Sequence, residues 1–178
     1  MNLRRVPLQR KTELTRSPLP PGKPLEARGG LRRTGWVPKP RSPRKAAEEA
    51  AEHRTKAIVK VRSGGSCEIC GAKAENVAHR VAKSQGGPWD PANALHLCGM
   101  GNVSGCHGWT HQNSGEDEGQ AGGWILRSHH DYAVEPAYIL HRDETGVARF
   151  GWVLLRSDGS VDQVTGRPAP TRFPWSRP

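Results

Sequence analysis

The sequence predicts an α+β fold in which a four-cysteine zinc site holds a two-stranded hairpin and a short helix together. A longer helix precedes this unit, and a small antiparallel sheet follows it. The four cysteines fall into two pairs within residues 67–106, after a run of strong helix formers and before short apolar runs separated by turn residues. We expect residues 1–42 to be a disordered basic arm, residues 43–115 the metal core with its leading helix, and residues 116–178 a β-rich region with a loose tail.

The composition favours a small core that needs a metal. Only 34% of the 178 residues are hydrophobic and 6% are aromatic, and a chain with so little apolar surface benefits from a covalent or metal crosslink. No apolar run approaches the ~20 residues of a membrane helix, and no signal-peptide pattern is present. The sequence therefore predicts a cytoplasmic protein with no membrane partner, and in that reducing compartment cysteines favour metal binding over disulfides.

The basic charge is concentrated at the N-terminal end. Residues 1–45 contain 13 Lys/Arg and 2 Asp/Glu, a net charge of +11, whereas the remaining 14 (27 − 13) and 15 (17 − 2) leave −1. A proline-rich basic arm on a near-neutral body favours contact with DNA phosphates, the alternative being a solubilising tail. The arm's candidate DNA contacts are the basic residues near its end and at the start of the next helix: Arg32, Arg33, Lys39, Arg41, Arg44 and Lys45.

A helix is predicted directly after the arm. Ser42 is a good N-cap and Pro43 suits the first helical position, while Gly64 and Gly65 provide the stop. Residues 46–61 between them are rich in strong helix formers. We expect Ile58 and Val61 to pack on the metal core.

The cysteine spacing predicts a structural zinc site. Cys67 and Cys70 form a tight Cys-x2-Cys half-site, and Cys98 and Cys106 form an open second half-site whose intervening glycines allow the chain to fold back. Zinc takes four thiolates in tetrahedral geometry, so two distant pairs can staple a small fold. Between and after the pairs we expect a strand at 76–82, a return toward the metal at 93–98 and a short helix at 106–113.

Three apolar runs in the last third of the chain predict strands. They lie at residues 124–127, 136–140 and 150–155, and the runs 143–146 and 157–159 have the composition of turns. We expect these strands to form a small antiparallel sheet beside the metal core.

The order of ligand-type residues over residues 64–113 resembles the HNH endonucleases, the ββα-metal nucleases, in their zinc-containing form. The chain shares with them Cys-x2-Cys, then a His, an Asn, a Cys and a Cys-His pair, and it is similar to small HNH proteins of actinobacteria and their phages. The resemblance implies that His79 is the general base that activates water. It also implies that Asn93 either holds this histidine and its loop in place or ligates the metal.

The same resemblance assigns the catalytic metal to two further histidines. His107 and His111 match the pair that binds the divalent ion, and their i,i+4 spacing on a helix is suited to chelation. Arg80 is a candidate phosphate clamp within the catalytic site and Lys83 a weaker phosphate contact. The family usually has Asp or His immediately before the general base, whereas this chain has Ala78. The identity of the catalytic metal is therefore left open among Mg²⁺, Mn²⁺, Ni²⁺ and Zn²⁺. It is also left open whether His79 is a metal ligand rather than the base.

Three functions follow from these residues. The first is a metal-dependent DNA endonuclease; if the phage likeness holds, it works in the host cytoplasm on phage DNA processing, with packaging proteins as partners. The second is a non-catalytic zinc module that binds DNA or a protein partner, which Ala78 favours. The third is a homing or restriction nuclease with its own sequence specificity, although the chain contains no recognition helix or repeated DNA module.

Overall fold

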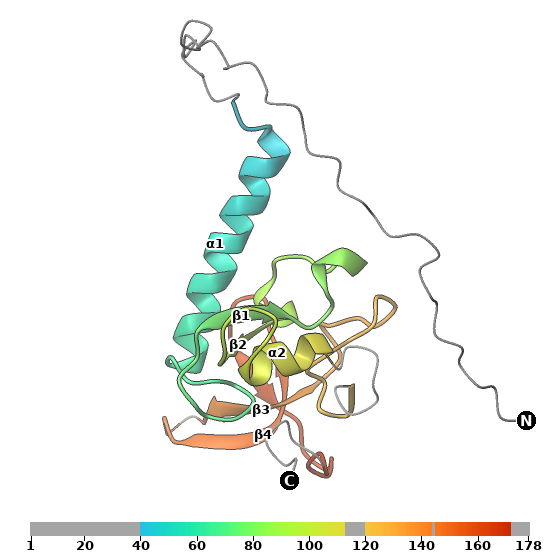
Figure 1. Ribbon diagram of the computed structural model, residues 1–178. Coiled ribbons are helices and arrows are strands. Elements are labelled where there is room, and N and C mark those ends of the chain that lie inside the picture. Colours follow the sequence, from blue (N-terminus) through green and yellow to red (C-terminus); the bar gives the residue numbers. More distant parts are fainter. Residues whose placement is uncertain (1–39, 113–119, 144, 172–178) are drawn as a thin grey trace, which may run out of the picture. The chain divides into compact units, whose positions relative to one another are not determined.

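The computed structural model describes residues 40–112, 120–143 and 145–171. Residues 1–39 of the predicted arm, with Arg32, Arg33 and Lys39, lie outside these residues. The α+β class is confirmed, and no helix among the described residues is long and apolar enough to cross a membrane. The elements, labelled in part in Figure 1, are α1 (Pro43–Ser63), β1 (Asn76–His79), the 3-10 turns η1 (Lys83–Gln85) and η2 (Pro91–Asn93), β2 (Ala94–Leu97), α2 (Gly105–Gln112), β3 (Ala137–Arg142), β4 (Ala148–Leu155) and β5 (Val161–Gln163).

Helix α1 begins and ends where its capping residues predict. The Ser42 hydroxyl accepts a hydrogen bond from the Lys45 backbone N–H at 3.4 Å, and Pro43 occupies the first turn. At the other end Gly64 adopts φ 59°, the left-handed conformation that favours glycine, and its N–H bonds to the carbonyl of Val61.

The buried residues of α1 all lie in its C-terminal half. Its buried residues Thr55, Val59 and Ser63 recur every four positions and form one stripe. The N-terminal half projects away from the body (Figure 1). The expectation that Val61 packs on the core is wrong, because Val61 lies off this stripe and is 82% exposed; Ile58 is half-buried, against Gly159.

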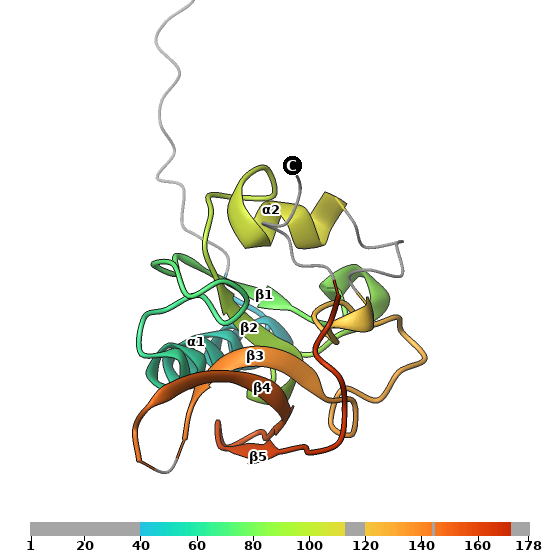
Figure 2. The ribbon, with the colours of Figure 1, turned by 90° about the horizontal axis from the view of Figure 1, so that it is seen from below.

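Two antiparallel sheets form around a shared core. In the first, β1 pairs with β2 from Asn76 opposite Leu97 to His79 opposite Ala94. In the second, β4 lies between β3 and β5. Figure 2 shows α2 on one side of the β1–β2 hairpin and the β3–β4–β5 sheet on the other.

The predicted C-terminal sheet exists, but its third strand is β5 and not residues 124–127. Among the described residues, this segment makes one isolated bridge, from Leu126 to Val81. The chain turns sharply before it, since Gly123 has φ 66° and a Cβ there would lie 2.0 Å from the Pro136 carbonyl oxygen. The start of the segment contacts β3, because the Trp124 indole N–H donates to the Tyr138 carbonyl at 2.6 Å and the Tyr138 N–H donates to the Gly122 carbonyl at 2.9 Å.

The hydrophobic core joins segments on both sides of residue 115. Residues 40–178 group as one compact unit. Buried side chains from the cysteine turn, the hairpin and α2 pack with those from β3 and β4, so the metal region and the later sheet bury one common surface. These core residues are Cys67, Ile69, Ala78, Ala92, Leu95, Leu97, Cys106, Trp124, Ala137, Ile139, Val153 and Leu155.

A buried ion pair fixes α1 to the hairpin. The Arg62 guanidinium donates to both carboxylate oxygens of Glu68, at 2.7 and 2.9 Å, and to the carbonyls of Pro91 and Ala94. The same carboxylate accepts from the His96 backbone N–H at 2.7 Å. Both side chains are buried, they are joined by two hydrogen bonds, and each makes further hydrogen bonds to the backbone. This pair therefore sets the position of α1 relative to β2.

Candidate functional site

The four cysteines converge as their spacing predicts. Cys67 and Cys70 lie in the turn after α1, Cys98 follows β2, and Cys106 lies in the first turn of α2. Their sulfurs all lie within 4.8 Å of one another, and those of Cys70 and Cys98 are 3.5 Å apart. A tetrahedral zinc with Zn–S bonds of ~2.3 Å requires sulfur separations of ~3.8 Å. The group therefore fits a single metal ion, with Cys67 and Cys106 buried.

The electrostatics of the four thiols also favour a cation. Hydrogen bonding from the Cys106 thiol lowers the pKa of Cys67 to about 5. Burial raises the pKa of Cys70 to about 12, and the hydrogen bond to Cys67, followed by burial, raises the pKa of Cys106. The Cys67 thiolate thus disfavours ionisation of the neighbouring thiols, whereas a bound divalent cation would stabilise all four thiolates together. The Cys106 backbone N–H also donates to the Cys98 sulfur at 3.4 Å.

Two glycines allow the second cysteine pair to close. Gly99 has φ 101°, and a Cβ there would lie 2.0 Å from the Ser104 carbonyl oxygen. Gly105 has φ 62°, and a Cβ there would lie 2.6 Å from the Cys98 carbonyl oxygen. Because the chain crosses itself this closely, only glycine fits at either position, and the open spacing of the pair becomes compatible with one metal.

His79 ends β1 with its ring half-buried against Trp89. The ring centroids are 4.1 Å apart at 56°, and Nε2 of His79 is buried with no hydrogen-bond partner among the described residues. Burial, followed by the charge of Lys83, lowers the pKa of His79 below its ordinary value. The imidazole is therefore neutral at pH 7 and can accept a proton.

His107 and His111 approach each other on one face of α2. Their Nε2 atoms are 3.2 Å apart, and Nδ1 of His107 is buried without a hydrogen-bond partner among the described residues. With metal–nitrogen bonds of ~2.1 Å, that separation corresponds to an angle of roughly 100° at a shared ion, suitable for two adjacent ligands. Burial and then the charge of His111 lower the pKa of His107, which keeps it in the ligand form.

A small cavity is lined by the predicted base and by one member of this pair, His111. Its volume is about 50 Å³, and its lining includes the side chains of His79, Gln85, Thr110 and His111. The structure thus brings His79 and His111 to one cavity, with His107 beside His111. Within residues 40–112, 120–143 and 145–171, the four cysteines are the one group of three or more Cys, His, Asp or Glu ligands that could hold a metal. The histidine pair therefore offers two protein ligands.

Asn93 is buried and uses its side-chain amide to hold the loop after His79. Its Oδ1 accepts from the Val81 N–H at 2.8 Å, and its Nδ2 donates to the carbonyls of Val81 at 3.2 Å and Pro88 at 3.1 Å. Gly87 makes this closure possible, since a Cβ there would lie 1.8 Å from the Val81 carbonyl oxygen. Of its two predicted roles, the geometry favours loop support over metal ligation.

Arg80 does not present its guanidinium to a phosphate, so its expected role as a clamp is corrected. The side chain is 1% exposed and donates to five carbonyl oxygens, those of Ala92, Gly123, Tyr132, Glu135 and Pro136. Burial lowers its pKa to about 9, which leaves it charged at pH 7. Strand alternation gives the reason: Ala78 and Arg80 are buried and His79 between them is half-buried.

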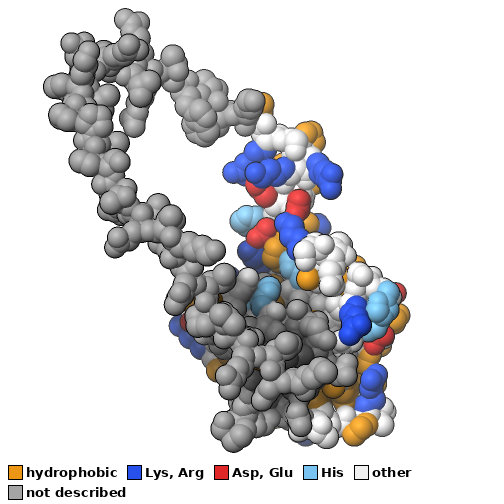
Figure 3. Space-filling view, turned by 45° about the vertical axis from the view of Figure 1, so that its right-hand side comes forward, with side chains coloured by type: hydrophobic (Ala, Val, Ile, Leu, Met, Phe, Trp, Pro, Cys, Tyr) orange, Lys and Arg blue, Asp and Glu red, His pale blue; other side chains and the backbone are white. Residues whose placement is uncertain are grey.

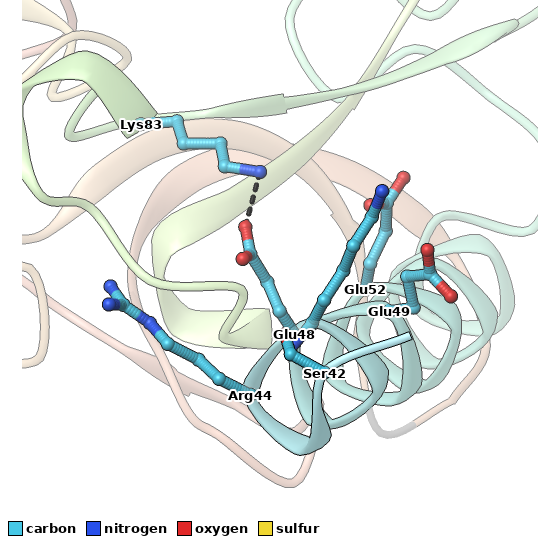
Figure 4. Close-up of a pocket in the computed structure, with 7 residues that line it drawn as sticks. Ser42, Arg44, Glu48, Glu49, Glu52 and Lys83 are labelled. Carbon is cyan, nitrogen blue, oxygen red and sulfur yellow. Dashed lines mark hydrogen bonds and ion pairs between the residues drawn. The ribbon is translucent and has the colours of Figure 1, made fainter. Parts of the chain in front are cut away.

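The described candidate phosphate contacts lie among carboxylates. A groove of about 420 Å³ between α1 and η1 is lined by Arg44, Lys45 and Lys83 together with Glu48, Glu49 and Glu52 (Figure 4). Lys83 reaches across to form an ion pair with Glu48, and Arg41 pairs with Glu49. Basic and acidic side chains likewise alternate over the visible face of α1 (Figure 3). The three formal positive and three negative charges of the groove cancel, so DNA contact by these residues stays a prediction.

The sequence-based reasoning missed two sets of positioning residues. Trp89 contacts His79 from a loop ten positions away in the sequence. Glu68, between two metal-site cysteines, anchors Arg62, and His96 Nδ1 lies 2.6 Å from the Ser63 hydroxyl in the same buried region. No local pattern identifies these partners, because each contact joins separate elements.

Comparison with models of protein families, with curated proteins and with solved structures gives no match.

Proposed function

We propose that the protein is a metal-dependent endonuclease of the HNH type that hydrolyses DNA phosphodiester bonds. The observation that supports this most directly is the shared cavity of His79 and His111, with His107 Nε2 3.2 Å from His111 Nε2. A neutral base beside a two-histidine chelate is the arrangement that water activation at a metal-bound phosphate needs.

The four-cysteine group is proposed as a structural zinc site. It joins the turn after α1, the end of β2 and the start of α2. An ion there would therefore crosslink α2, which carries His107 and His111, to β2, the strand paired with the His79 strand β1. The order β1, β2, α2 is that of a ββα-metal finger, which supports the family assignment. DNA is the proposed substrate, and processing or packaging of phage DNA is the biological role that the resemblance suggests.

Each residue of the chain has a distinct proposed task. The neutral imidazole of His79 takes a proton from the attacking water, and Asn93 holds the loop that follows it. His107 and His111 would hold a divalent ion, and such an ion would supply Lewis-acid stabilisation of charge at the scissile phosphate. The products would carry a 5′-phosphate and a 3′-hydroxyl, as in the family.

The test is a plasmid-nicking assay with Mg²⁺, Mn²⁺, Ni²⁺ or Zn²⁺ added to full-length protein that holds one zinc per chain and no other divalent ion. His79→Ala is expected to lower the rate by ~10²–10⁴-fold, the contribution of a general base. His107→Ala is expected to lose the added-metal dependence, whereas His53→Ala, at an exposed position on α1, serves as the matched control. A parent protein that cuts with none of these ions, or an unimpaired His79→Ala variant, would exclude the proposal.

The second candidate is a non-catalytic zinc module that binds DNA or a protein. It is favoured by Ala78 before His79 and by the four cysteines being the one three-ligand group among the described residues. Metal analysis distinguishes the two: this candidate requires one zinc per chain and no second divalent site that His107→Ala removes.

A further inference from the structure

A layered contact connects α1 with the proposed base. The Trp89 indole contacts the His79 ring, and the Lys56 ammonium lies 5.2 Å from the centre of the Trp89 ring. Glu52, one turn earlier on α1, accepts a hydrogen bond from Lys56 at 2.5 Å. The series Glu52–Lys56–Trp89–His79 therefore extends from the helix, through a loop side chain, to the end of β1.

We propose that Trp89, held under the ammonium of Lys56, is a positioning residue that keeps the His79 imidazole turned toward the cavity shared with His111. This rests on the proposed nuclease function. A catalytic base is commonly oriented by a hydrogen bond from a third group. Nε2 of His79 has no such partner among the described residues, so ring contact with Trp89 supplies the orientation instead.

The Lys56 contact explains why the indole itself stays in place. An ammonium over an indole face is attracted by the ring quadrupole, most strongly where water is partly excluded. The Trp89 Nε1 atom is buried with no hydrogen-bond partner among the described residues. The indole is therefore positioned by its ring contacts with His79 and Lys56. The middle of α1, where Glu52 and Lys56 lie, thereby becomes part of the catalytic unit.

Steady-state kinetics on the full-length protein test the proposal. Trp89→Leu is expected to lower kcat roughly 10-fold with little change in KM, because misorientation of a base impairs the chemical step. Trp89→Phe, which keeps an aromatic face, should recover most of the rate. Lys56→Met should lower kcat by a smaller factor and Lys56→Arg should restore it, while Lys60→Met removes the same charge from an exposed site on α1 and should have no effect.

A spectroscopic arm separates this inference from the proposed function. In the parent, the His79 ring proton signals should be shifted by the indole ring current, and Lys56→Met should displace those signals whereas Lys60→Met should not. If His79→Ala abolishes cleavage but Trp89→Leu and Lys56→Met, both folded by circular dichroism, keep the parent kcat, the positioning role is wrong. If no variant cleaves DNA at all, unchanged His79 signals in Lys56→Met overturn the inference and displaced signals support it.

Discussion

Replacing Arg80 by Met tests whether this residue holds the fold together or contacts substrate. Its guanidinium donates to five carbonyl oxygens at 2.7–3.2 Å and lies 1% exposed. With a net ~1 kcal/mol for each hydrogen bond, the five contribute roughly 5 kcal/mol before desolvation of the charge is subtracted. Methionine fills a similar volume but leaves these oxygens without their donor, so we expect a loss of about 3–5 kcal/mol.

Urea unfolding of the zinc-loaded protein, followed by tryptophan fluorescence, measures this loss. Arg80→Lys keeps the positive charge but not the planar guanidinium with its five donors, so it should recover only part of the lost free energy of unfolding. Arg54→Met, at an exposed position of α1, should change the stability by less than ~0.5 kcal/mol. A loss below ~1 kcal/mol, with cleavage abolished in the folded Arg80→Met protein, would return Arg80 to a phosphate-binding role and refute the structural argument.

Three further predictions concern the metal, the loop and the base. Removal of the metal at the four cysteines with a chelator should lower the melting temperature measured by differential scanning fluorimetry, because the ion crosslinks three elements. Added zinc should restore the melting temperature. An unchanged melting temperature would mean that no ion is held there. Asn93→Ala should cost ~2–3 kcal/mol and raise amide hydrogen exchange in residues 81–88, since three hydrogen bonds to Val81 and Pro88 are lost. Cleavage should persist above, and disappear below, a midpoint lower than His79's ordinary ~6.5, because its pKa is lowered and the neutral form acts. Lys83→Met removes a charge that lowers this pKa, so the midpoint should rise in the pH–rate profile, and an unmoved midpoint would show that Lys83 does not act on His79.

The local elements of this protein follow from short-range patterns in its sequence. Ser42, Pro43 and Gly64 bound α1 because capping depends on backbone groups only a few residues away. The cysteine spacing predicts the convergence of the four sulfurs, since thiolates of this kind gather on one metal. Alternation of Ala78, His79 and Arg80 in the predicted strand 76–82 contains the signal that Arg80 is buried, although its residue type suggested a phosphate contact.

Only the tertiary structure decides which distant groups meet. The contact of Trp89 with His79, the five carbonyls around Arg80 and the pairing of Arg62 with Glu68 each join separate elements. The same holds for residues 124–127, whose apolar pattern fits a strand equally well but which make only an isolated bridge to Val81 among the described residues. Periodicity specifies which face of an element is apolar, whereas the partner of that face depends on how all the elements pack at once.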